Sequence, residues 1–198
     1  MYKYIQYRID KIHLIEILSI WDSYFSRKIR LIACGGTALT LLNIKESTKD
    51  IDFIVPQERE YKYLLKILFD LGYSQQTSYG WRKDEGFIFD LYFGNRVYTT
   101  ELLESPLEEG NNIPIKEFAH TYLGVLNYYD LIITKIFRSA SVDIEDCLAL
   151  FRKKYREIDI KKLVDRYSET SSYDISPEKN IKNFKYFLDI LKEEGFKI

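Results

Sequence analysis

The sequence predicts an α+β fold, with a small mixed β-sheet flanked by helices and a helical C-terminal subdomain. Two observations support this prediction. In the first part of the chain, short apolar segments bounded by Gly, Pro or polar residues alternate with amphipathic segments. In the second part, the apolar residues recur only at the spacing of a helix. We therefore expect residues 1–125 to form the core and residues 126–198 to pack on it as helices.

Apolar spacing and turn residues place the individual elements. We expect helices over residues 10–26, 37–44 and 57–71, and strands over residues 30–34, 51–55, 73–77, 80–83 and 87–93. Residues 97–117 show no clear pattern. In the C-terminal part, Asn127 can cap a helix that runs to Arg138, a break follows at residues 139–141, and further helices are expected around 144–151, 159–168 and 177–194.

Composition limits the class of protein. The chain has 198 residues, of which 46% are hydrophobic, so it can bury a sizeable core. Its net charge of −1 argues against a protein that binds polyanions over its whole surface. Cys34 and Cys147 lie in apolar surroundings and are expected to be buried free thiols. Without a membrane-length apolar segment or a secretion signal, we expect a soluble cytoplasmic protein without a membrane partner.

Three carboxylates form the candidate metal site. Asp50 and Asp52 are two residues apart along a predicted strand, so both point to one face while Ile51 points to the other. Adjacent carboxylates repel one another unless a cation lies between them, and oxygen ligands suit Mg²⁺. Asp90 lies within the apolar segment Phe87–Phe93, where an unpaired acid is costly. The three acids together predict a site for two Mg²⁺ ions.

A glycine pair supplies the second part of the candidate site. Gly35, Gly36 and Thr37 follow a predicted strand and precede a predicted helix. Backbone N–H groups at such a junction can approach a phosphate group, and Thr37 can add a hydroxyl. A tight strand-to-helix connection is the alternative explanation for the glycines alone. Combined with the nearby carboxylates, the pattern favours nucleotidyl transfer from a nucleoside triphosphate (NTP), in which Asp90 also contacts the acceptor hydroxyl.

These residues resemble the signature of the minimal nucleotidyltransferases related to DNA polymerase beta. The resemblance rests on the segments 35–39 and 48–53, and on Lys135 with the following segment 143–146. It is strongest to the AbiEii-type toxin nucleotidyltransferases and to the similar group labelled DUF6036. The resemblance implies a nucleotidyltransferase core in residues 1–125, phosphate binding at Gly35, Gly36 and Thr37, and Mg²⁺ binding at Asp50 and Asp52.

The resemblance also assigns roles in the C-terminal part. Lys135 corresponds to the family's helix lysine, and Asp143 and Asp146 correspond to its Asp-x-x-Asp motif. They are expected to contribute to nucleotide binding, with the two acids orienting Lys135 or binding the acceptor. The alternatives are an ordinary solvated lysine and a helix-capping Asp143. The chain departs from the family at Glu46, Ala140 and Val142, where relatives often carry cations, although Arg138 lies nearby.

Three kinds of acceptor or role follow from the sequence. The first hypothesis is transfer of a nucleotide to RNA, such as tRNA, by a toxin or phage-defence enzyme with a cognate antitoxin protein. Lysines interleaved with tyrosines in the C-terminal helices are compatible with RNA stacking, although core packing explains them as well. The second hypothesis is adenylylation of a small antibiotic. The third is a protein-modifying enzyme or a non-catalytic nucleotide-binding module.

Overall fold

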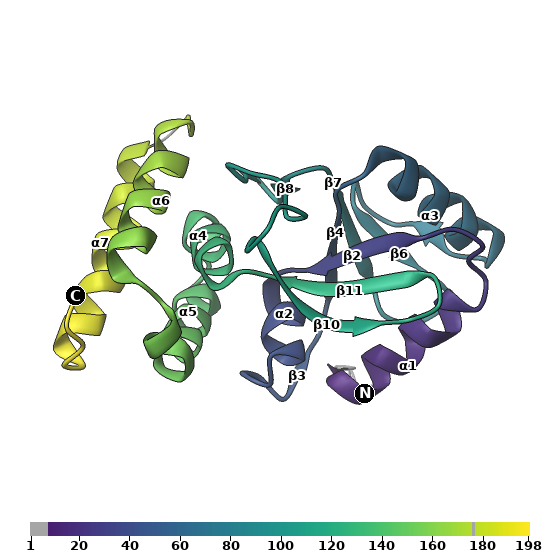
Figure 1. The fold of residues 1–198 in the computed structure, drawn as a ribbon, viewed down its shortest axis with the longest axis horizontal. Coiled ribbons are helices and arrows are strands. Elements are labelled where there is room, and N and C mark those ends of the chain that lie inside the picture. The colour runs from purple at the N-terminus through teal and green to yellow at the C-terminus, as the bar shows by residue number, and fades with distance from the viewer. Residues whose placement is uncertain (1–7, 176) are drawn as a thin grey trace, which may run out of the picture.

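A computed structural model describes residues 8–175 and 177–198 and shows the predicted α+β architecture (Figure 1). Its central sheet has seven strands in the order β10-β11-β2-β4-β7-β6-β5. The β11/β2 and β4/β7 pairs are parallel, and the other pairs are antiparallel, so the sheet is mixed. The strands of this sheet are β2 (Ile29–Ala33), β4 (Ile51–Val55), β5 (Ser74–Gln75), β6 (Gly80–Arg82), β7 (Phe89–Phe93), β10 (Asn112–Glu117) and β11 (Thr121–Leu126).

Helices lie around this sheet and beyond its last strand. Helices α1 and α3 lie at one end of the molecule and α4 to α7 at the other, with α2 between the sheet and α4 (Figure 1). No helix among the described residues is long and apolar enough to cross a membrane. The helices are α1 (Lys11–Asp22), α2 (Gly35–Leu41), α3 (Glu58–Asp70), α4 (Tyr128–Arg138), α5 (Ser141–Lys154), η1 (Tyr155–Glu157), α6 (Ile160–Ser172) and α7 (Pro177–Glu193).

Two short ribbons complete the fold. Strand β1 (Ile9–Asp10) pairs with β3 (Ser47–Thr48), and β8 (Arg96–Val97) pairs with β9 (Thr100–Glu101). The β8–β9 hairpin falls in the stretch for which the sequence predicted no structure. Figure 1 shows it between β7 and the C-terminal helices.

The expected bounds of two helices were wrong. The first helix, α1, ends at Asp22 and not at residue 26. We expected the helix after the glycine pair to span residues 37–44, but α2 begins at Gly35 and ends at Leu41. The glycines therefore form the first turn of the helix and not a separate loop. The helix stops early because Asn43 adopts a positive φ of 56°, a conformation that an α-helix does not continue.

The expected helix cap at Asn127 is confirmed. Its side chain accepts a hydrogen bond from the backbone N–H of Asp130 at 2.8 Å. Ser139, in the left-handed conformation, ends α4, and α5 begins at Ser141. The break expected at residues 139–141 is thus present, and it folds α5 back against α4.

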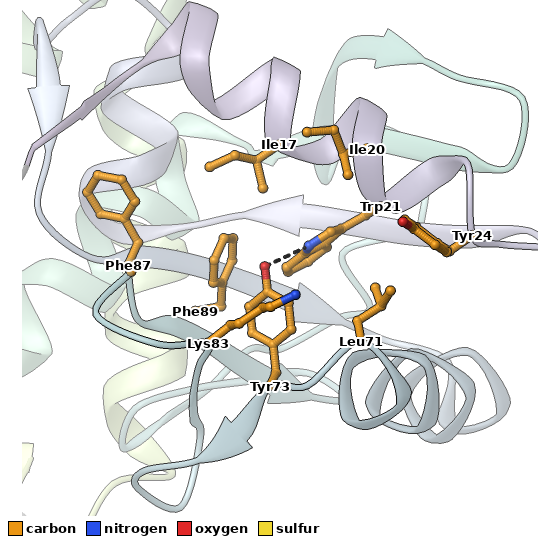
Figure 2. A pocket seen from close by; sticks show the side chains of 10 residues that line it. Ile17, Ile20, Trp21, Tyr24, Leu71, Tyr73, Lys83, Phe87 and Phe89 are labelled. Carbon is orange, nitrogen blue, oxygen red and sulfur yellow. Dashed lines mark hydrogen bonds between the residues drawn. The ribbon is translucent and has the colours of Figure 1, made fainter.

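An aromatic cluster fixes the end of the sheet next to α1. Trp21 from α1 packs on Phe89 of β7 with ring centroids 4.5 Å apart, and its indole N–H donates to the Tyr73 hydroxyl at 3.1 Å. Figure 2 shows these three rings beside a hollow of about 240 Å³. Side chains alternate along a strand, so Phe89 and its neighbour Asp90 face opposite sides of the sheet. This packing therefore holds β7 from the side opposite the carboxylate.

Candidate active site

Two of the predicted carboxylates are direct neighbours in the sheet. Asp52 on β4 and Asp90 on β7 are register partners in the parallel pair. Partners in register point to the same face, so their carboxylates lie side by side. Asp50 lies immediately before β4 and is exposed. The negative charges of Asp90 and Asp50 both raise the pKa of Asp52, so the structure brings the three acids into one electrostatic site.

Asp52 is the most strongly perturbed of the three. Its side chain is buried, and burial raises its pKa to about 7. The hydrogen bond from Tyr98 and the charge of Arg138 lower this pKa, whereas the charges of Asp90 and Asp50 raise it further. Burial and the charge of Asp50 also raise the pKa of Asp90. Among residues 8–175 and 177–198, no cationic side chain forms an ion pair with Asp52. Asp52 thus has no direct ion-pair partner in the described part of the chain, although the charge of Arg138 lowers its pKa.

The donor set fits Mg²⁺. In the described part of the chain, no three His, Cys, Asp or Glu side chains are grouped to hold one metal ion. Mg²⁺ does not require such a cage, because it usually binds one or two carboxylates and takes its other oxygen ligands from water and substrate phosphates. The buried Asp52 carboxylate beside Asp90 is a donor pair of this kind. Binding of Mg²⁺ by Asp50, Asp52 and Asp90 stays a prediction.

The glycine pair lets α2 approach these carboxylates. Gly35 has a φ of +57°, and a Cβ atom on it would lie 2.6 Å from Asp52 Oδ2. A Cβ on Gly36 would lie equally close, at 2.6 Å, to the hydroxyl oxygen of Thr48. At Gly35 the positive φ and the close carboxylate together favour glycine, so the first turn of α2 lies directly against Asp52. The role of these N–H groups in phosphate binding stays a prediction.

Thr37 has a structural task that the sequence did not indicate. Its hydroxyl donates to the backbone oxygen of Asp50 at 3.1 Å and accepts from the backbone N–H of Asp52 at 2.9 Å. The Thr48 hydroxyl also donates to Asp50 O, at 3.0 Å. Thr37 thus positions the two acids relative to α2. Its direct contact with a phosphate stays a prediction.

We expect Gly35→Ala to disrupt the site more than the fold. A residue with a Cβ at positive φ costs about 1–2 kcal/mol, and the new methyl group would displace the Asp52 carboxylate. Nucleotide transfer should fall by at least about 10-fold, because small displacements of reacting groups are costly. Gly110→Ala is the matched control, since Gly110 has a φ of +80° but no atom within 4 Å of the added Cβ. Equal activity losses in both variants would contradict the assigned role of Gly35.

Lys135 lies in a buried cluster of charges. Its side chain is 3% exposed, and its Nζ atom lies 2.8 Å from Asp146 Oδ2 and 3.3 Å from Asp143 Oδ1. The expectation that Asp143 and Asp146 orient Lys135 agrees with this geometry, although the two acids lie on α5 and the lysine on α4. The alternative of an ordinary solvated lysine is wrong, because burial and pairing leave Lys135 almost no contact with solvent. Its contact with a nucleotide stays a prediction.

Asp143 also caps α5, as the alternative interpretation held. Its Oδ2 atom accepts a hydrogen bond from the backbone N–H of Ala140 at 3.1 Å. Both oxygens accept hydrogen bonds from the Arg138 guanidinium, at 2.8 and 2.5 Å. Asp143 therefore joins the end of α4 to the start of α5 while it holds Lys135.

Two further cations complete the cluster. Lys45 lies 2.8 Å from Asp146 Oδ1, and Arg138 is paired with Asp143. Relatives often carry cations at the positions of Glu46, Ala140 and Val142. In this chain the nearby residues Lys45 and Arg138 supply cations that contact the two acids. The sequence indicated Arg138 as a nearby cation, but it gave no indication that Lys45 reaches Asp146. With Lys135 they make three cations against two carboxylates, a positive excess next to α2.

Tyr98 is the main residue that sequence reasoning missed. Its hydroxyl donates a hydrogen bond of 2.8 Å to Asp52 Oδ1. The Arg138 guanidinium carbon lies 4.7 Å from the centre of its ring. No sequence signal pointed to Tyr98, because it lies in the unpatterned stretch and reaches Asp52 across 46 residues.

Asp130, in the first turn of α4, belongs to a separate buried cluster. Both of its oxygens accept hydrogen bonds from Arg166, at 2.8 and 2.9 Å, and Arg166 also pairs with Glu104. Asp130 is 2% exposed. This cluster joins α4, α6 and the loop before β10, and it lies outside the carboxylate site.

Known proteins share both the sequence pattern and the fold. A family model described as a nucleotidyltransferase of unknown function (DUF6036) matches residues 13–194. The crystal structure of ANT(2″)-Ia in complex with adenylyl-2″-tobramycin has a TM-score of 0.57 and 16% identity, covering 82% of this chain and 98% of that one. The solution structure of the antibiotic-resistance factor ANT(2″)-Ia has a TM-score of 0.55 and 17% identity, covering 83% and 94%. At these identities the likeness shows the fold. A search of curated proteins finds no match.

Proposed function

The chain belongs to the DUF6036 family of nucleotidyltransferases, and on that basis we propose that it moves a nucleoside monophosphate from an NTP to an acceptor hydroxyl with the help of Mg²⁺. One observation carries the proposal. Asp52, the register partner of Asp90, lies directly against the glycine turn that opens α2. This arrangement supports a cation-binding pair of carboxylates beside backbone N–H groups that can contact phosphate.

Three groups of residues would bind the triphosphate and its Mg²⁺ ions. Asp50, Asp52 and Asp90 would hold one or two Mg²⁺ ions, which neutralise charge on the phosphates. Gly35 and Gly36 offer backbone N–H groups to the triphosphate. The excess positive charge of Lys45, Lys135 and Arg138 lies next to α2 and attracts the same anion.

The proposed step forms one bond and breaks another. The acceptor oxygen bonds to the α-phosphorus, the bond between the α-phosphorus and the bridging oxygen breaks, and pyrophosphate leaves. The hydroxyl proton passes to Asp90, the carboxylate that lies beside Asp52 in the sheet.

A small molecule with hydroxyl groups is the acceptor that the structure favours. A pocket of about 410 Å³ lies between the β8–β9 hairpin and the end of α6, with Arg96, Glu101 and Phe137 in its lining. The Tyr98 side chain that reaches Asp52 belongs to the same hairpin. The pocket has the size of a small-molecule site, and the adenylyl-tobramycin complex shows that a protein of similar fold binds such a compound.

RNA is the second proposed acceptor. Its support is the exposure of tyrosines near lysines in the C-terminal helices, such as Tyr173 and Tyr186. Tyr167, by contrast, is buried and stacked on Phe184, so part of the tyrosine pattern is core packing. A toxin role with an antitoxin partner would follow only from the RNA acceptor.

One assay tests the reaction and separates the acceptors. The protein is incubated with Mg²⁺ and each NTP labelled at the α-phosphate, in the presence of aminoglycosides, total tRNA or whole-cell protein. Label on an aminoglycoside supports the first acceptor, and label on tRNA supports the second. No transferred label in any fraction, or equal transfer by Asp50→Ala, would contradict the proposed function.

A further inference from the structure

Tyr98 occupies an unusual backbone position. Strands β8 and β9 are joined by the two-residue turn Tyr98-Thr99, in which Tyr98 has a φ of +53°. Turns of this kind favour Gly, Asn or Asp at positive φ, because a side chain with a Cβ is disfavoured there. A tyrosine at this position therefore carries backbone strain, and such strain is common at functional sites.

The Tyr98 side chain contacts three separate elements. Its hydroxyl donates to Asp52 of β4 at 2.8 Å, its ring centre lies 5.0 Å from that of Tyr92 on β7, and the guanidinium carbon of Arg138 on α4 lies 4.7 Å from its ring centre. The half-buried tyrosine thus fixes one oxygen of the most buried carboxylate of the site.

Arg138 extends this connection to the C-terminal helices. The same guanidinium that stacks on Tyr98 makes two hydrogen bonds to Asp143, and Asp143 contacts Lys135. Tyr98 is therefore the junction between the Asp52 carboxylate and the charge cluster on α4 and α5.

We propose that Tyr98 is a positioning residue that orients Asp52 for a divalent cation and couples cation binding to the Arg138–Asp143–Lys135 cluster. The inference rests on the proposed function, because it takes Asp52 to be a metal ligand. Hydrogen-bond partners of ligating carboxylates fix their orientation, and their loss weakens metal binding by about 10- to 100-fold. The charge cluster would then bind nucleotide more tightly when the cation is present.

The test measures Mn²⁺ binding as a substitute for Mg²⁺, by the loss of the free-ion electron paramagnetic resonance signal. It uses the full chain, with and without a non-hydrolysable ATP analogue. Tyr98→Phe keeps the ring and removes only the hydroxyl, and we expect its Mn²⁺ dissociation constant to rise about 10-fold. Arg138→Gln should weaken binding by a smaller factor, and the double variant should be no weaker than Tyr98→Phe, because both changes act through the same oxygen.

Tyr79→Phe is the matched control, since Tyr79 belongs to the same row of rings but its side chain is partly exposed and packs on Tyr92 instead of Asp52. It should bind Mn²⁺ like the wild type, and circular dichroism should show all variants folded. Equal affinities of wild type and Tyr98→Phe would overturn this inference and leave the proposed function standing. Independent, multiplicative effects of the two substitutions would overturn the coupling. A wild-type chain that binds no Mn²⁺ under either condition would overturn the metal assignment together with the inference.

Discussion

Asp52→Asn should abolish nucleotide transfer and at the same time stabilise the metal-free protein. The amide cannot supply the anionic oxygen that Mg²⁺ requires, so we expect a loss of at least about 10³-fold in kcat/KM, corresponding to roughly 4 kcal/mol of transition-state stabilisation. The stability gain follows from burial, because the wild-type carboxylate is held in a site without a cationic partner.

The sign of the pH dependence follows from the raised pKa of Asp52. Its pKa is about 7 in the folded protein, against an ordinary value of 3.8. Between about pH 4 and pH 7 the folded state therefore retains a proton that the unfolded state has lost, and stability falls as the pH rises through this window. Three pKa units correspond to about 4 kcal/mol. Above pH 7 the full penalty is present, and Asp52→Asn removes it.

Urea unfolding of metal-free wild type and Asp52→Asn from pH 4 to pH 8 measures this effect. The two stabilities should diverge with rising pH, and added Mg²⁺ should stabilise only the wild type. Asp70→Asn serves as the control, because Asp70 is an exposed carboxylate at the end of α3. Parallel pH profiles for wild type and Asp52→Asn would contradict the assigned burial. An active Asp52→Asn enzyme would contradict the metal role.

Local periodicity was sufficient to predict much of this site. Alternation along one strand placed Asp52 opposite Ile51 and Phe53, which are both fully buried. The glycine pair opens α2, and the acid pair follows this short helix, a loop and β3. Their proximity therefore follows from the strand–helix–strand order. The fold class was predictable for the same reason, since each apolar segment up to β7 is bounded by clear turn residues.

Long-range contacts were not predictable from these patterns. The apolar surroundings of Asp90 indicated a functional acid, but they did not indicate its register with Asp52. That register arises because β7 inserts between β4 and β6, next to a strand that precedes β5 and β6 in the sequence. Tyr98 lies in a two-residue turn without glycine, which gives no turn signal. Lys45 reaches Asp146 across 101 residues. Each of these contacts is set by tertiary packing, and no spacing rule applies to it.

Asp143→Ala should be the most destabilising single change in the charge cluster. Asp143 is fully buried and accepts hydrogen bonds from Lys135, Arg138 and the backbone of Ala140. Burial alone would raise the pKa of Asp143, but the hydrogen bonds of Arg138 and the charges of Lys135 and Arg138 outweigh it and keep that pKa below its ordinary value. Removal of one partner from a buried ion pair typically costs about 3–5 kcal/mol, because it leaves the other charge uncompensated.

Urea unfolding at pH 7 measures this loss, and the direction of the Asp143 pKa shift gives a second check. A lowered pKa contributes stability above about pH 4 that is lost as the pH falls, so the difference between wild type and variant should shrink in acid. Asp165→Ala is the control, since Asp165 forms an exposed pair with Lys161 on α6 and its removal should leave the unfolding midpoint almost unchanged. If Asp143→Ala were as stable as this control, Lys135 and Arg138 would have to be compensated elsewhere.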